Sequence, residues 1–332
     1  MRTGVGLFPT EPVGTMCGYA RLAERLGYES VWLGDSQNIW RESSVTLGAI
    51  AAGTERVKLG TGVTNAVTRH RSLLASTWAT LAEFTGGRAC LGIGTGDSSL
   101  RTMGLSPLRL GQLEEAITEL RALLRGETVT EPTSGAQYHL NYVDEPLQIP
   151  IYIAASAPKI LELSGRVADG VILLAGTSPD FVAAALDRIE KGARSAGRTL
   201  ADLDIVLWTP TAIADDPATA HDLVRAHVSR VVIRPLPAEI SPSLQSAVDH
   251  IRETYNYYEH MDTRADHAGL VPDELVDLFA LAGTTDDCLK RLRALEGLKI
   301  DEVAIVPFVP HGTSRTRTIE QFADLAVRRA TS

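Results

Sequence analysis

The stretch that decides the fold runs from Thr61 to Ser99 and reads TGVTNAVTRHRSLLASTWATLAEFTGGRACLGIGTGDSS. A short apolar strand ends in Gly-Val-Thr-Asn, a helix-length segment follows, and a second strand at 89–93 opens into a glycine-rich turn at 94–97. This pattern is typical of a strand–helix–strand unit with polar loops after both strands. In parallel α/β folds, the carboxyl ends of the strands are where ligands bind.

Strand-like and helix-like segments alternate along most of the chain. No GxGxxG follows the first strand, where Phe8-Pro9-Thr10 stands instead, so a dinucleotide-binding open sheet is the weaker alternative. Repeated strand–helix units favour a closed (β/α)8 TIM barrel of the α/β class. The strands that we expect lie at 3–8, 30–33, 57–64, 89–93, 151–155, 170–174, 205–213 and 303–306.

A single TIM-barrel domain over residues 1–332 accommodates this pattern, provided that it carries insertions. Less regular segments lie near 98–110, 127–148 and 229–276, and the helix before the last of them is expected at 217–228. Because loops after barrel strands carry the binding residues, we expect these segments to shape a substrate pocket.

The composition narrows the classes of partner. A net charge of −9 makes nucleic acid a poor partner, and no apolar run reaches the length of a membrane span, about 20 residues. The start of the chain reads as a strand rather than a signal peptide, so we expect a cytoplasmic protein that acts on a small molecule. The spacing of the cysteines and histidines matches no metal motif, and no metal is expected.

Five stretches, spread over nearly the whole chain, resemble the bacterial-luciferase-like superfamily. The likeness is greatest to its branch of deazaflavin (coenzyme F420)-dependent oxidoreductases and methylenetetrahydromethanopterin reductases. Each stretch is loose alone, but their order is specific. They are 30–35, 60–65 with 68–70, 86–88 with 91–97, 151–155 with 165–170, and 282–284 with 301–303.

The resemblance implies a flavin-type cofactor at the C-terminal mouth of the barrel. Coenzyme F420 is the expected cofactor and FMN the alternative. The resemblance also implies a cis peptide bond between Gly62 and Val63 behind the cofactor ring, and we expect a homodimer.

Three residues are candidates for the chemistry. Trp40 lies in a polar stretch, where related enzymes place a tryptophan over the substrate side of the ring. Ser36 stands where related dehydrogenases carry an acid/base histidine, and a neutral hydroxyl is a poor general base. The remaining candidate is Asp97, which could act as acid/base if burial raises its pKa; the alternative is a turn aspartate that caps the next segment.

The expected cofactor-binding residues come from five strand ends. Ser156 and Ala157 precede a helix whose free amides could bind a phosphate, with Gly176 and Thr177 as the partnering turn. For Asp35, a loop or helix-capping role is the alternative. The full set is Asp35, Gly62, Val63, Thr64, Asn65, Thr95, Gly96, Ser156, Ala157, Gly176 and Thr177.

These observations lead to three functional hypotheses. The first is an oxidoreductase that transfers a hydride between coenzyme F420 and a small organic substrate. The second is a two-component monooxygenase that uses reduced FMN and O2. The third is a non-catalytic flavin-binding relative, which the Ser36 replacement would explain.

Overall fold

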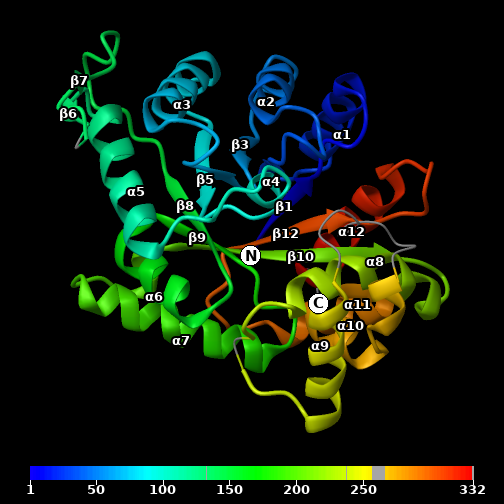
Figure 1. Cartoon of the computed structure of the whole chain (residues 1–332). Coiled ribbons are helices and arrows are strands. Elements are labelled where there is room, and N and C mark those ends of the chain that lie inside the picture. Colours follow the sequence, from blue (N-terminus) through cyan, green and yellow to red (C-terminus); the bar gives the residue numbers. More distant parts are fainter. Residues whose placement is uncertain (132, 237, 256–265, 331–332) are drawn as a thin grey trace.

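Parallel strands close into an eight-stranded barrel in the computed structural model, which describes residues 1–131, 133–236, 238–255 and 266–330 (Figure 1). The strands are buried from both sides, as is typical of a parallel sheet covered by helices. The predicted TIM barrel is confirmed. Around the ring the strands are β1 (Arg2–Leu7), β2 (Ser30–Leu33), β3 (Lys58–Thr61), β5 (Ala89–Gly94), β8 (Ile151–Ala155), β9 (Gly170–Leu173), β10 (Asp204–Ile213) and β12 (Glu302–Pro307).

The ring closes at β12, which pairs with β1 on one side and with β10 on the other. A further parallel strand, β11 (Leu281–Gly283), pairs with only the last residues of β10. The sequence interpretation did not include β11 as a strand, because three residues are too short for a periodic pattern. The prediction of the fold does not depend on β11, since the eight expected strands form the closed ring.

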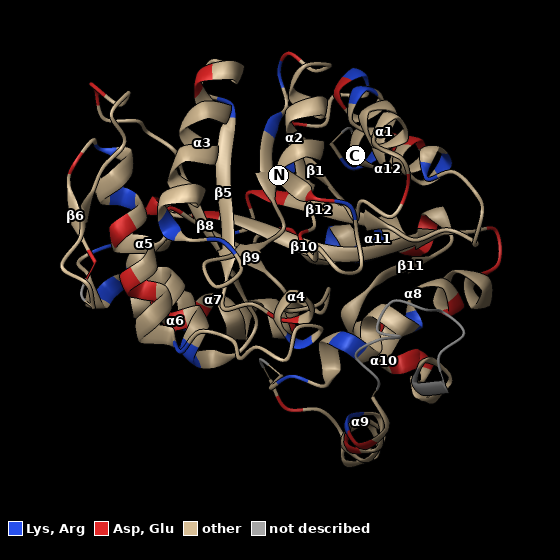
Figure 2. Ribbon diagram, turned by 45° about the horizontal axis from the view of Figure 1, so that its top comes forward, with Lys and Arg blue, Asp and Glu red and all other residues tan. Residues whose placement is uncertain are grey.

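Helices surround the barrel and pack their apolar faces against the strands (Figure 1). In Figure 2 the charged residues lie mainly on these outer helices and on loops. None of the described helices is long and apolar enough to cross a membrane. The main helices are α1 (Val13–Arg25), α2 (Ser43–Ala51), α3 (Arg71–Thr85), α5 (Leu110–Leu124), α6 (Pro158–Val167), α7 (Pro179–Ser195), α8 (Pro217–Val232), α11 (Thr285–Ala294) and α12 (Thr316–Ala330).

The segments expected as insertions contain short elements of their own. Of the third segment, residues 256–265 lie outside the described residues. The predicted end of the helix after β10 was wrong: α8 continues past Val228 to Val232, and this extension carries Arg230 toward the barrel mouth. The short elements are β4 (Thr64–Asn65), α4 (Ser98–Arg101), β6 (Val129–Thr130), β7 (Gln137–Tyr138), η1 (Leu200–Asp202), α9 (Pro242–Thr254), η3 (Asp266–Leu270) and α10 (Asp273–Phe279).

A polar network fills the end of the barrel where the strands begin. Glu302 is 1% exposed, and its Oε1 accepts hydrogen bonds from Ser30 Oγ at 2.5 Å and Trp32 Nε1 at 2.9 Å. Arg2 lies 3.7 Å from Glu302 and forms a closer ion pair with Asp204. Burial raises the pKa of the Glu302 carboxyl, although these donors and Arg2 oppose that rise.

Replacing Glu302 with glutamine should change how stability depends on pH. Because the folded-state pKa is raised, the contribution of the neutral carboxyl is fully present below the ordinary value of 4.5 and is lost as pH rises through the folded-state pKa. The unfolding free energy of the wild type minus that of Glu302→Gln should therefore fall between acid and neutral pH. Denaturant unfolding at several pH values measures it. A matching trend in Glu296→Gln, at an exposed position, would show that burial is not the cause.

Candidate functional site

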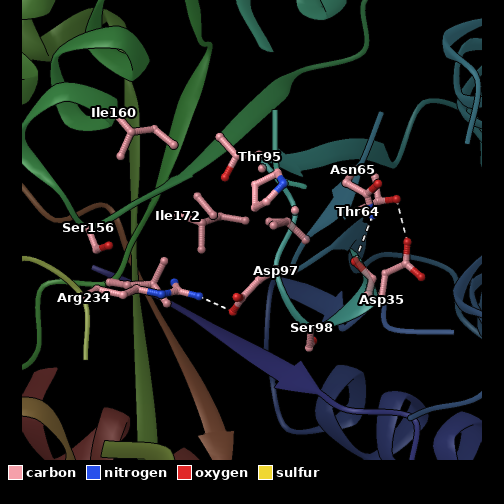
Figure 3. A pocket seen from close by; sticks show the side chains of 18 of the residues that line it. Asp35, Thr64, Asn65, Thr95, Asp97, Ser98, Ser156, Ile160, Ile172 and Arg234 are labelled. Atoms are coloured by element: carbon pink, nitrogen blue, oxygen red, sulfur yellow. Dashed lines mark hydrogen bonds and ion pairs between the residues drawn. The ribbon is translucent and has the colours of Figure 1, made fainter. Parts of the chain in front are cut away.

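A cavity of about 360 Å³ opens at the carboxyl ends of the barrel strands (Figure 3). Its walls come from the loops after most strands and from the residues around the end of α8. Of the fourteen residues expected in the site, eleven line it. They are Asp35, Trp40, Gly62, Val63, Thr64, Asn65, Thr95, Gly96, Asp97, Ser156 and Ala157.

Asp35 ends up at the cavity because β2 stops two residues before it. Its Oδ2 accepts a hydrogen bond from Thr64 Oγ1 at 2.6 Å and forms an ion pair with Arg69, which also pairs with Glu42. Burial lowers the pKa of the Arg69 guanidinium, but the carboxylates of Asp35 and Glu42 outweigh burial and hold this pKa above its ordinary value. The other oxygen, Oδ1, is buried and has no hydrogen-bond partner among the described residues.

The peptide bond between Gly62 and Val63 is cis, which confirms the prediction made from the resemblance. Both residues line the cavity, and so does Gly94 at the end of β5. A Cβ at Gly94 would come 3.0 Å from Val63 Cγ2. Because glycine leaves this wall without side chains, backbone and a valine form a surface against which a flat ring can pack.

Trp40 and Phe8 form an aromatic wall of the cavity. The two rings stack with their centroids 4.5 Å apart and an angle of 16° between their planes. Gly34 makes room for the stack, since a Cβ there would lie 2.6 Å from Phe8 and 2.9 Å from Trp40. The position predicted for Trp40, at the cavity and outside the core, agrees with its half-buried side chain.

Asn65 holds two rim segments together. Its Oδ1 accepts the amide hydrogens of Val67 and Thr68, and its Nδ2 donates to Ser99 Oγ at 3.1 Å. Thr95 and Gly96 lie in the neighbouring turn, where Gly96 has a φ of 95° that favours glycine. Their presence at the cavity follows from this bracing of the rim.

The start of α6 faces the cavity with Ser156, Ala157 and Lys159. No side chain caps this helix, and Pro158 occupies its first turn. The first amides of a helix lack partners within the helix and carry a partial positive charge, which suits an anion. Lys159 is exposed and adds a full positive charge at the same place.

Three of the expected site residues do not line the cavity. Ser36 is fully buried behind it, and its Oγ lies 3.0 Å from Ser98 Oγ. The amide of Thr177 donates to Leu278 at 2.8 Å and its hydroxyl to the Ala280 carbonyl at 3.1 Å. The Thr177 groups thus attach the loop after β9 to the segment before β11, and the neighbouring Gly176 lies close to the Leu278 carbonyl. Ser36, Gly176 and Thr177 are therefore the expected site residues that the structure does not bring to the cavity.

Asp97 bridges the barrel mouth and the end of α8. Its Oδ2 accepts from Arg230 Nη2 at 3.2 Å and forms an ion pair with Arg234, while Arg101 lies 3.4 Å from Oδ1 (Figure 3). Its side chain gives no capping hydrogen bond to α4, so the alternative role as a helix cap does not apply. Guanidinium groups stabilise the ionised carboxylate, whereas an acid/base role requires the reverse.

Sequence reasoning missed the cationic residues of the cavity, Arg101, Lys159, Arg230 and Arg234. No motif marks them. Arg230 and Arg234 fell within the segment expected to shape a substrate pocket, and the only signal in the sequence is their spacing of four, which places two side chains on one side of a helix.

Comparison with known proteins places the chain in a family. The model of the luciferase-like monooxygenase family matches residues 2–302. The chain belongs to this family. It is an enzyme of the luciferase-like type, in agreement with the resemblance found in the sequence.

Individual relatives are similar over most of the chain. A 5,10-methylenetetrahydromethanopterin reductase of Methanolobus tindarius is 34% identical, over 96% of this chain and 98% of the relative. A glucose-6-phosphate dehydrogenase of Beutenbergia cavernae, named as F420-dependent, is 35% identical over 63% of this chain and 67% of its own length. The structure of the coenzyme F420-dependent tetrahydromethanopterin reductase of Methanopyrus kandleri superposes with a TM-score of 0.78 at 25% identity, over 98% of both chains.

The described residues contain no group of three or more His, Cys, Asp or Glu placed to hold a metal ion. The chemistry open to the cavity therefore depends on an aromatic wall, a glycine-lined wall, one carboxylate with a spare oxygen and several cations. These features suit a planar, hydrogen-bonding ring with an anionic extension.

Replacing Gly34 with alanine should disrupt the aromatic wall. The new methyl group collides with both Phe8 and Trp40, so one ring must leave the stack, at a cost of roughly 1–3 kcal/mol in unfolding free energy. Near-ultraviolet circular dichroism should lose part of its tryptophan signal. Gly14→Ala in α1 is the matched control, because a Cβ there has nothing within 4 Å. An unchanged spectrum in Gly34→Ala would contradict this account of the wall.

Proposed function

We propose that the protein is a coenzyme F420-dependent oxidoreductase that transfers a hydride between the deazaflavin and a small organic substrate. The observation that carries the proposal is the buried Asp35 Oδ1, which lines the cavity and has no partner among the described residues. A buried acceptor without a donor is costly, and an N–H at the edge of a flavin-type ring would satisfy it. The F420-dependent relatives support this choice of cofactor.

The residues of the cavity fit such a cofactor. Val63 and the glycines beside it offer a flat surface for the ring, and Thr64 and Arg69 fix the Asp35 carboxylate at its edge. The start of α6, with Ser156 and Lys159, suits the phosphate of the cofactor side chain. When bound, the deazaflavin supplies a carbon that accepts or donates a hydride.

The chain's own part in the reaction is to position the substrate and exclude water. The Phe8–Trp40 stack and the glycine-lined wall both bound the cavity, and holding two reactants face to face accounts for a large share of the rate. For Asp97 we propose an electrostatic role in place of the proton transfer expected from the sequence, because its carboxylate forms ion pairs with Arg230, Arg234 and Arg101. Ser36 lies behind Ser98 and has no direct route to a substrate.

The alternative is a two-component monooxygenase that uses reduced FMN and O2. The description of the matching family favours this candidate. Both cofactors present a planar ring and a phosphate, so the same cavity residues serve either one. The hypothesis of a non-catalytic relative is weaker. It was based on Ser36 in place of a histidine, and Ser36 does not line the cavity.

Titration of the purified chain with each cofactor tests the proposal. Coenzyme F420 should bind with micromolar or tighter affinity and FMN more weakly, as measured by fluorescence or calorimetry. Lys159→Gln should weaken F420 binding roughly three- to tenfold, because one cation is removed from a partly solvated phosphate site.

Lys290→Gln, which removes an exposed lysine on α11 far from the cavity, is the control and should bind as the wild type does. Tighter binding of FMN, with O2 uptake when a flavin reductase and NADH are added, would favour the monooxygenase instead. Failure of both cofactors to bind would overturn the enzyme mechanism proposed for this cavity.

A further inference from the structure

Cationic side chains outnumber carboxylates among the described residues that line the cavity. Arg101, Lys159, Arg230 and Arg234 all line it, in a chain whose net charge is −9. The lining residues include two carboxylates, and one of these, Asp35, is already neutralised by Arg69. Such a local reversal of charge indicates a bound anion.

Arg230 and Arg234 are the cations that α8 and its end contribute. The ion pairs that the structure describes for both of them go to Asp97, and both hydrogen bonds end on the same oxygen, Oδ2. Among the described residues, one negative charge therefore pairs with two guanidinium groups. Each guanidinium carries five N–H donors, so most of their donor capacity remains for another oxyanion.

Two further observations agree with an incompletely neutralised pair. The Nε of Arg230 is buried and makes no hydrogen bond to any described residue. Burial, together with the like charge of the neighbouring Arg230, lowers the pKa of the Arg234 guanidinium. The side chains of Arg230 and Arg234 are 18% and 31% exposed, which keeps them accessible from the mouth.

The pair and the expected phosphate site come from different elements. Arg234 follows α8 and is directed at Asp97 (Figure 3), whereas Ser156 precedes α6 and Ile160 lies in its first turn. We propose that Arg230 and Arg234 bind a carboxylate or phosphate group of the substrate, and that Asp97 is the internal counter-ion from which the substrate takes them. The substrate class is thus a small organic anion. The identification of this anion as a substrate rests on the proposed function, whereas the anion-binding site itself does not.

Calorimetric titration with inorganic phosphate and with succinate, at low and constant ionic strength, tests this inference on the whole chain. Arg234→Gln should weaken anion binding by about tenfold or more, because a charge-assisted bidentate site is lost. Arg101→Gln is the matched control: it removes an arginine from the same cavity that also faces Asp97, and it should cost less than about threefold.

The Asp97→Asn variant gives the most specific test, because the proposal predicts tighter anion binding. Removing the internal counter-ion should tighten anion binding several-fold, whereas a residue that merely stabilises the fold would leave it unchanged or weaken it. If Arg234→Gln does not fold, judged by thermal melting, Arg230→Gln is measured in its place. Equal losses in Arg234→Gln and Arg101→Gln, or weaker binding in Asp97→Asn, would overturn the proposal.

Parallel titrations separate this site from the cofactor's phosphate site and phosphates from carboxylates. If Lys159→Gln abolishes anion binding and Arg234→Gln leaves it unchanged, the anion binds at the start of α6. This outcome would contradict the proposal for the arginine pair. Saturation with coenzyme F420 should remove only the Lys159-dependent binding. If F420 does not bind at all, the Arg234-dependent binding of phosphate or succinate by the free chain still decides the inference, so the two proposals fail separately.

Discussion

Closure of the parallel ring at β12 is the constraint on which the remaining structure depends. β12 pairs with β1 and with β10, so the first and last strands of the chain are neighbours. Once the ring is closed, all strands point the same way and their carboxyl ends meet at one mouth. Asp35, Asp97 and Ser156, which are far apart in sequence, come together for this reason alone.

The polar network at the opposite end explains how the ring tolerates charge inside. Glu302 belongs to the closing strand, and its carboxyl accepts hydrogen bonds from Ser30 and Trp32 of a neighbouring region of the barrel. Fully partnered buried polar groups restrict the packing to one arrangement, since a shift of register leaves them unpaired. This network lies at the end of the barrel where the strands begin, and the site residues lie at the other end, on the loops after the strands.

The fold and the glycine-lined half of the cavity followed from the sequence, because both depend on local patterns. Strand ends carry Gly-Val-Thr-Asn and Gly-Thr-Gly-Asp, and their place in the ring fixes where they point. The cationic half did not follow, since it depends on where α8 ends. Four extra residues of helix bring Arg230 to the cavity, and a helix end is set by packing against neighbours more than by propensity. Thr177 was not brought to the cavity for a related reason: its amide and hydroxyl bond to Leu278 and Ala280, just before β11, and this tertiary contact has no local pattern in the sequence.

The electrostatic role of Asp97 also changes how the loss of the family's histidine is understood. In the proposed role, the carboxylate that pairs with three arginines is exchanged for the anionic group of the substrate. The charge balance of the cavity then stays nearly constant as the substrate enters, which avoids leaving buried cations unpaired in the free enzyme. Ser36 is buried and lies against Ser98, which follows Asp97 in the chain, so we infer that the residue at the histidine's position acts by packing.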